Sequence, residues 1–356
     1  MVGHMALPGY VRYYKSVATI REMATPSSLN NIVLQNLLRD KLNFNGVIVT
    51  DASHMVAMTS AMKRSDMLPK AISAGCDLFL FFNDPEEDFN WMMEGYKKGI
   101  ITDERLEDAL TRILGLKASL GLHKKAKTEI LQPKEEAMAK IGTEKNKSVA
   151  LEISDKAVTL VKNNEEIFPI TPSKYKKVLL VEVKGPDTGY GKVMGAMMGG
   201  RKTPVQITKE LLEKEGFEVE IYESAIEKLL KLPPQEMMGA VMNVYAQKRP
   251  ISDLTDNYDL IINLANIGPS TDQRIQWNPS KGTPDIPFYV NEVPTIFVSL
   301  NCPFHLADVP QVQTYINTYD SKEHTLSALV EKMTGHSEFK GIDPVDAFCG
   351  FIDTRY

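Results

Sequence analysis

The sequence predicts an α/β protein of two domains, each built on a parallel sheet covered by helices. Short apolar runs rich in β-branched residues alternate with segments of helical periodicity, and this alternation occurs in two separate series. A stretch rich in Lys and Glu separates the two series. At 356 residues and 43% hydrophobic composition, the chain is long enough to form two separate cores.

Three strands are expected in the first series, which occupies residues 1–123. They are Met1–Met5, Gly46–Thr50 (GVIVT) and Asp77–Phe82 (DLFLFF). Helical spacing of apolar residues predicts helices between and after these strands. The expected helices are Ser28–Leu42, Met67–Ala74, Pro85–Lys98 and Asp103–Leu120. Ser27 or Ser28 is placed to cap the first helix and Asp103 the last, while Gly75 and Gly121 mark helix ends.

A linker is expected at residues 124–150, because residues 124–147 are rich in Lys and Glu and contain no aromatic residue. The second domain then spans residues 151–356. Its strand-like runs are 178–183, 217–223, 260–266, 294–300 and 314–319, and its helical stretches are about 203–215, 234–247 and 322–333. The alternation predicts a doubly wound parallel sheet.

Composition and charge exclude several classes of function. A net charge of -5, from 41 Lys+Arg against 46 Asp+Glu, gives no attraction to nucleic acid or to an anionic membrane. No apolar run reaches the roughly 20 residues of a membrane helix, and the first residues lack the pattern of a secretory signal. Cys76, Cys302 and Cys349 are too scattered for a disulfide framework or a metal site. We therefore expect a cytoplasmic protein that acts on a small substrate.

Asp51 is the first candidate for chemistry. It follows the apolar run GVIVT, and the carboxyl ends of strands are where α/β proteins meet their ligands. A carboxylate there is placed to face a substrate. From this position alone, a second interpretation stays open, in which Asp51 caps the following segment or pairs with a neighbouring cation.

The sequence around Asp51 resembles the last part of the barrel of family 3 glycoside hydrolases. The resemblance runs through LLRDKLNFNGVIVTDASHMVAM, then AISAGCDLFLF, then GIITDERLEDALTRILGLKASLGL, in the family's order and spacing. The matching residues of the last helix are Arg105, Leu106, Ala109, Arg112, Ile113, Leu114, Leu116, Lys117, Gly121 and Leu122. The segments SDKAVTLVKN and YDSKEHTLSALVEKMTGHSEFKGIDPVDAF resemble the α/β domain that the family appends to its barrel.

This resemblance implies a partial (β/α)8 barrel, containing the last three strand-helix units, followed by a doubly wound α/β sandwich domain. It also implies a retaining glycosidase in which Asp51 is the nucleophile, with no cofactor and no metal. The opening MVGH and the TDASHM segment are most similar to the β-N-acetylhexosaminidase branch, in which an Asp-His pair upstream of these strands supplies the acid/base. That segment is absent from these residues, so we expect an incomplete and inactive enzyme whose partial barrel self-associates.

Three further residues are predicted to contact the sugar. His4 ends the first strand and would point toward Asp51, whereas His54 and Met55 lie where the family's loop borders the sugar. For His4 a structural role, and for His54 and Met55 loop packing, are the alternatives. Acidic residues at a predicted helix start are instead assigned to its first turn, where their charges interact favourably with the helix dipole. They are Asp84, Glu86 and Glu87.

Other functions stay open. The glycine-rich loop KGPDTGYGKVMGAMMGG fails the spacing of a phosphate-binding loop and of a dinucleotide fingerprint, and is expected to be a surface loop. A β-glucosidase or β-xylosidase is the runner-up enzyme, because Asp51 does not report on the substituent at C2 of the sugar. Transfer to phosphate in place of water, and a non-catalytic module that binds a sugar or a partner, are the remaining alternatives.

Overall fold

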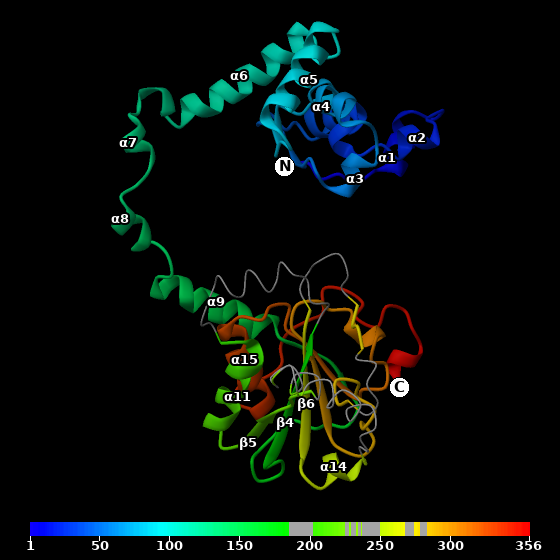
Figure 1. The fold of residues 1–356 in the computed structure, drawn as a ribbon, viewed down its shortest axis with the longest axis vertical. Helices are drawn as coiled ribbons and strands as arrows, with labels where there is room; N and C mark the ends of the chain where they lie inside the picture. Colours follow the sequence, from blue (N-terminus) through cyan, green and yellow to red (C-terminus); the bar gives the residue numbers. More distant parts are fainter. Residues whose placement is uncertain are drawn as a thin grey trace. The chain divides into compact units, whose positions relative to one another are not determined.

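The chain divides into two units, Met1–Glu136 and Ala137–Tyr356. A computed structural model describes residues 1–184, 202–224, 228, 233, 236, 250–267, 274–277 and 283–356 (Figure 1). The glycine-rich loop and almost all of the predicted helix 234–247 lie outside the described residues.

The first unit is built around a small parallel sheet. Strand β1 (Val49–Ala52) pairs with strand β2 (Leu78–Leu80), and an isolated bridge joins Val2 to Thr50 on the other side of β1. The expected strand Met1–Met5 is thus reduced to one bridge. The sheet places the amino-terminal residues, β1 and β2 side by side.

Strand β1 begins at Val49 and not at Gly46, as the sequence had predicted. The reason is a side chain: the buried Asp77 carboxylate accepts the Ile48 N–H at 2.8 Å, and Ile48 O accepts the N–H of both Asp77 and Leu78. Ile48 is therefore held by Asp77 and not by a regular ladder of backbone hydrogen bonds.

Helices surround this sheet. They are α1 (Pro8–Tyr14), α2 (Ile20–Met23), η1 (Ser27–Leu29), η2 (Ile32–Lys41), α3 (Val56–Thr59), α4 (Arg64–Ala74), α5 (Pro85–Lys97), α6 (Asp103–Ser119) and η3 (Leu122–Lys124). The sequence had not predicted α1, α2 or α3. Gly75 and Gly121 adopt positive φ angles of 133° and 67° directly after α4 and near the end of α6, which confirms both as helix ends.

Two predicted caps are wrong. Thr102, and not Asp103, caps α6, because its Oγ1 accepts the Arg105 N–H. Neither Ser27 nor Ser28 caps the long helix η2, since both lie in the preceding 3-10 turn η1. Ser, Thr and Asp side chains all cap helices well, so the sequence near a helix start could not decide which of these residues would serve as the cap.

Exposed chain follows the first helices. Two short helices, α7 (Lys127–Ile130) and α8 (Lys134–Met138), contain no buried residue. Helix α9 (Glu144–Ala157) begins inside the predicted linker and packs against α15 (Glu323–Thr334) of the second unit.

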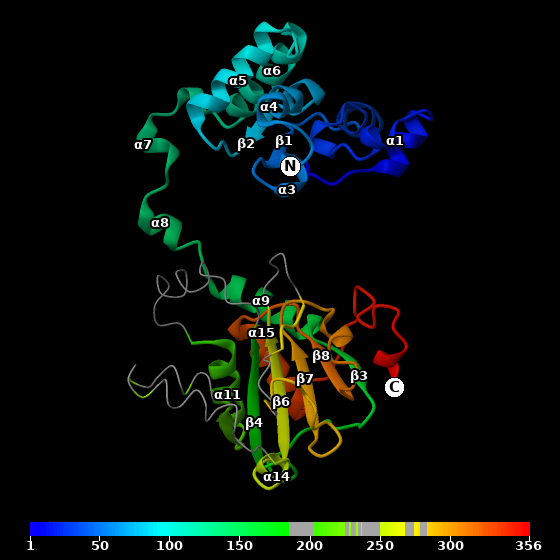
Figure 2. The same cartoon turned by 45° about the vertical axis from the view of Figure 1, so that its right-hand side comes forward.

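The second unit contains a six-stranded sheet in the order β3-β8-β7-β6-β4-β5 (Figure 2). The strands are β3 (Thr159–Asn163), β4 (Lys177–Lys184), β5 (Glu218–Ile221), β6 (Leu260–Asn266), β7 (Thr295–Ser299) and β8 (Thr314–Asn317). Neighbouring strands are parallel except for β3, which runs antiparallel to β8. The prediction of a wholly parallel sheet is therefore wrong at this edge.

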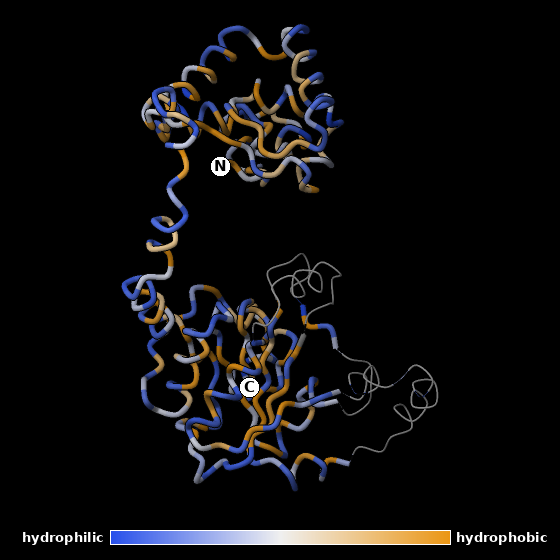
Figure 3. Tube along the Cα trace, turned by 60° about the vertical axis from the view of Figure 1, so that its left-hand side comes forward, coloured by the Kyte–Doolittle hydropathy of each residue, from blue (hydrophilic) through white to orange (hydrophobic). Residues whose placement is uncertain are grey.

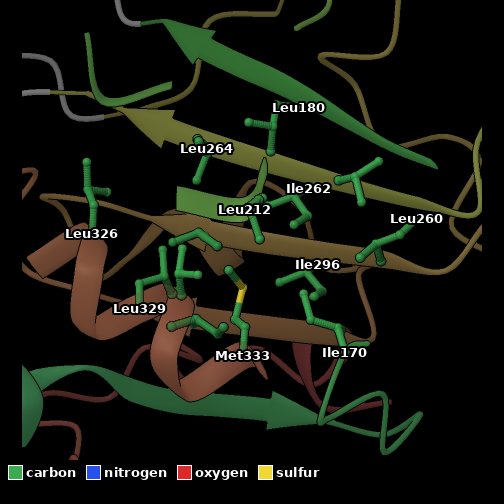
Figure 4. Packing of buried hydrophobic residues seen from close by; sticks show 14 of the residues in the cluster. Ile170, Leu180, Leu212, Leu260, Ile262, Leu264, Ile296, Leu326, Leu329 and Met333 are labelled. Carbon is green, nitrogen blue, oxygen red and sulfur yellow. The ribbon is translucent and has the colours of Figure 1, made fainter. Parts of the chain in front are cut away.

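Helices α11 (Pro204–Lys214) and α15 pack on one face of this sheet, together with α9. The main core lies between the sheet and these helices, and it includes Leu180 and Ile262 on the strands and Leu329 of α15 (Figure 4). Apolar side chains also fill the opposite face, and Figure 3 shows apolar residues along these strands. Burial on both faces explains why these strands read as continuous apolar runs. The remaining described helices are α14 (Ser252–Thr255), η4 (His305–Ala307) and η5 (Asp353–Arg355).

Candidate active site

Asp51 is the second-to-last residue of strand β1. Its N–H donates to Val2 O at 3.0 Å, and its Oδ1 accepts the N–H of Ala52 at 2.8 Å. The side chain is half-buried. Helix α3, which follows, has no side-chain cap, so Asp51 does not cap it. The backbone that carries this carboxylate is thus fixed, and one of its oxygens is held by the next peptide.

His4 is buried, with 6% of its surface exposed, and it braces the same strand end. Its Nε2 lies 3.0 Å from Ala52 O and its Nδ1 lies 2.7 Å from Ser28 Oγ. Because a carbonyl only accepts, Nε2 carries a proton and donates it to Ala52 O. The ring therefore fixes the Ala52–Ser53 peptide, one residue after Asp51. A sugar contact of His4 stays a prediction.

His54 and Met55 lie in the turn that leaves β1, where the Met55 N–H donates to Ala52 O at 3.1 Å. Both side chains are exposed, and the His54 ring stacks on the Phe81 ring with 6.0 Å between centroids. The structure thus brings both residues to the end of the strand that carries Asp51. Their contact with a sugar stays a prediction.

A group of hydrogen-bonded polar residues, which were not predicted from the sequence, connects the end of β1 to the end of β2. Arg64 Nη2 donates to Ser53 Oγ at 3.1 Å, and the guanidinium forms a bidentate pair with Asp88 at 2.8 and 2.5 Å. The second Asp88 oxygen also accepts the Asn83 N–H at 3.0 Å. The hydrogen bonds from Arg64 hold the pKa of the Asp88 carboxyl below its usual range.

The opposite end of β2 carries a purely structural ion cluster. The Asp77 side chain is fully buried and pairs with Arg39 at 2.8 Å and with Arg105. Arg105 and Arg112 both pair with Asp108 on the same helix, α6. Asp77 directly precedes β2, whereas Asp51 lies at the carboxyl end of the neighbouring strand β1. Arg105, which was part of the family resemblance, thus anchors α6 to Asp77 at the start of β2, whereas Arg112 pairs with Asp108 inside α6.

Among the described residues, no group of three or more His, Cys, Asp or Glu side chains is arranged to hold a metal ion. In the same ranges, none of the helices has the length and apolar content needed to cross a bilayer.

Residues 1–116, which contain this whole arrangement, match the model of the glycosyl hydrolase family 3 N terminal domain. Over its full length the chain is 37% identical to a β-N-acetylglucosaminidase/β-glucosidase of Cellulomonas fimi, of which it covers 58%. The chain belongs to glycoside hydrolase family 3. This membership confirms the family to which the motifs around Asp51 pointed.

Two solved structures are similar to the whole chain. All of this family 3 chain superposes on a β-glucoside phosphorylase BglX with a TM-score of 0.81 at 36% identity, and covers 58% of it. A structure of that phosphorylase bound to 2FGlc gives a TM-score of 0.80, also at 36% identity, over 99% of this chain and 57% of the relative. The chain therefore spans somewhat more than half the length of these relatives.

Proposed function

We propose that this chain carries the nucleophile of a retaining family 3 β-glycosidase site, and that Asp51 is that nucleophile. The supporting observation is the way the Asp51 strand end is held from both sides. The Asp51 N–H bonds to Val2 O at 3.0 Å, and the Ser53 N–H bonds to Leu80 O of β2 at 3.0 Å. A nucleophile must be presented in a fixed direction to react efficiently.

The chemistry proceeds in two displacements. An Asp51 oxygen attacks the anomeric carbon, the bond from that carbon to the leaving-group oxygen breaks, and a glycosyl ester forms on Asp51. An acceptor oxygen then attacks the same carbon from the opposite side and releases the carboxylate. The resemblance assigns the proton donor for the first step to an Asp-His pair that these residues do not contain. We therefore expect this chain to turn over ordinary glycosides poorly.

The first unit fits the last three strand-helix units of a (β/α)8 barrel. The observations that favour this arrangement are the three parallel neighbours, Val2, β1 and β2, and the helices η2 and α4 that connect them. Residues around β2 are exposed, including Leu78 at 40% and Phe82 at 65%. An unpaired edge with apolar neighbours favours self-association of the partial barrel. The three scattered cysteines are the sequence feature behind the proposed reducing, cytoplasmic location.

The sugar is proposed to be a terminal β-linked N-acetylglucosamine, or glucose as the runner-up, because the relative from Cellulomonas fimi carries both names. Phosphate is the second candidate acceptor beside water. The observation that favours phosphate is the 36% identity to a β-glucoside phosphorylase over the whole chain.

Leaving groups of different basicity test this proposal on the chain itself. The dinitrophenolate of a 2,4-dinitrophenyl β-glycoside leaves without taking up a proton, whereas the methoxide of a methyl β-glycoside must be protonated as it leaves. We expect slow turnover of the first and none of the second, with the sugar 1-phosphate as product if phosphate is the acceptor. Equal turnover of both glycosides by purified chain would show that a proton donor is present.

Asp51→Ala tests the nucleophile, with the exposed Asp40→Ala as matched control. Activity of Asp51→Ala should collapse at unchanged stability, and azide should restore a product of inverted configuration, because the small anion attacks from the vacated face. Asp40→Ala should behave like the unchanged chain. Near-normal activity per folded molecule of Asp51→Ala would end the nucleophile assignment.

A further inference from the structure

Phe81, directly after β2, has an unusual backbone. Its φ angle is +54°, in the left-handed region that bulky side chains rarely adopt. Its ring is 55% exposed, so the ring does not gain core packing in return. Strain of this kind persists where the surrounding structure enforces it, and it clusters at ligand sites.

The surrounding hydrogen bonds enforce the conformation of Phe81. The Ser53 hydroxyl, on the segment that leaves β1, donates to Phe81 O. Before Phe81, the Leu80 N–H donates to Thr50 Oγ1 at 2.9 Å. After it, the Asn83 N–H donates to the Asp88 carboxylate at 3.0 Å. The chain is thus tied on both sides of the strained residue.

Arg64 closes this arrangement into one unit. Its guanidinium binds both Asp88 oxygens and reaches Ser53 Oγ at 3.1 Å. The Arg64 and Asp88 side chains are 15% and 6% exposed, so this pair is largely withdrawn from water and its geometry is well fixed. Phe81 is therefore held relative to the segment that begins at Asp51.

The direction of the Phe81 ring is also defined. It stacks on His54, with 6.0 Å between centroids and 29° between planes, and His54 is itself exposed on the turn after Asp51. Two exposed rings from adjacent strand ends thus form one surface, and His54 stands three residues after the proposed nucleophile. Water solvates such a surface poorly, so covering it with an apolar group is favourable.

We propose that Phe81 is a substrate-contacting residue, whose ring packs against a C–H-rich face of the glycoside. The inference rests on the proposed function, because it places this ring next to a sugar at Asp51. The shared chemistry is an apolar face, which either the pyranose ring or the aglycone can supply. Ser53, Arg64 and Asp88 are positioning residues that act on this contact through the position of Phe81.

Binding of two glycosides to the full chain tests this role. The probes are methyl and p-nitrophenyl N-acetyl-β-glucosaminide, and dissociation constants are measured by saturation-transfer NMR, which detects weak binding. Phe81→Leu should weaken binding roughly fivefold, because stacking is lost, and Phe81→Tyr should restore it. The matched control is Phe89→Leu on α5, whose ring is 63% exposed, and it should bind normally.

The outcomes separate the two levels of inference. A loss with both probes identifies the sugar as the partner of Phe81, and a loss with the nitrophenyl probe alone identifies the aglycone. Equal dissociation constants for Phe81→Leu and the unchanged chain would overturn the role of Phe81 and leave the proposed function standing. Failure of every protein to bind, the unchanged chain included, would contradict the proposed sugar site and this inference together. Unfolding temperatures of all variants identify any loss caused by misfolding.

Discussion

Replacing Asp77 with Asn is expected to destabilise the first unit by about 3–5 kcal/mol, the usual cost of breaking a buried ion pair. The Asp77 carboxylate is fully buried and accepts from Arg39, Arg105 and the Ile48 N–H. Asn keeps the shape, but it removes the charge and turns an NH₂ group toward one of these donors. The Arg39 guanidinium, 8% exposed, would then lack its counterion, and the Arg105 guanidinium, 11% exposed, would keep only Asp108.

Urea unfolding measures this effect. The chain has 2 tryptophans, so a Trp277→Phe background leaves Trp91 of α5 as the single reporter of the first unit. The matched control is Glu94→Gln, which breaks an exposed pair with Lys98 and should give no measurable change. A loss below about 1 kcal/mol for Asp77→Asn would refute the reasoning, because an uncompensated buried charge cannot cost so little.

Three other perturbations follow from the structure. Because Arg64 lowers the pKa of Asp88, the carboxylate contributes stability at neutral pH, and this contribution is lost as pH falls through the lowered pKa. The difference in unfolding free energy between the unchanged chain and Asp88→Asn should therefore narrow below about pH 4. A constant difference down to about pH 2 would contradict this. Native-state trypsin should cut within residues 124–140, which are almost wholly exposed, and leave a stable carboxyl-terminal piece; resistance of this stretch would count against it. Lys332 is fully buried and pairs with Asp155 at 2.7 Å. Asp155→Asn should therefore lower the free energy of unfolding in urea by about 2 kcal/mol, and Lys332→Met should lower it by less, because it removes the buried cation itself. The reverse order would be inconsistent with a buried cation.

Strands buried on both faces were the most predictable part of the fold. The run 260–266 matches β6 at both ends, because every residue from Leu260 to Ala265 is buried and all residues of the run except Asn263 and Asn266 are apolar. The start of β1 was not predictable, because it depends on Asp77, far along the chain, taking the Ile48 N–H. The antiparallel β3 was missed as well, since alternation of strands and helices does not specify strand direction.

The candidate site was predictable only where its residues are contiguous. Asp51, His54 and Met55 stand in one motif, and local sequence was enough to single them out. The partners Ser53, Arg64 and Asp88 are scattered, and the acidic start of α5 concealed Asp88 among residues that suit a helix dipole. His4 was found as a polar residue at a strand end, but its contacts with Ser28 and Ala52 depend on tertiary structure.

Covalent labelling of Asp51 tests the central claim most directly. A glycosyl fluoride needs no proton to depart, and a second fluorine on the sugar ring slows breakdown of the glycosyl ester, so the ester accumulates without the acid/base. The probes are N-acetyl-5-fluoro-β-glucosaminyl fluoride and 2-deoxy-2-fluoro-β-glucosyl fluoride, with intact mass and peptide mapping as readout. We predict one added sugar on the peptide that contains Asp51, and none on Asp51→Asn. A folded chain that stays unlabelled, or that carries the sugar on another residue, would contradict Asp51 as the nucleophile.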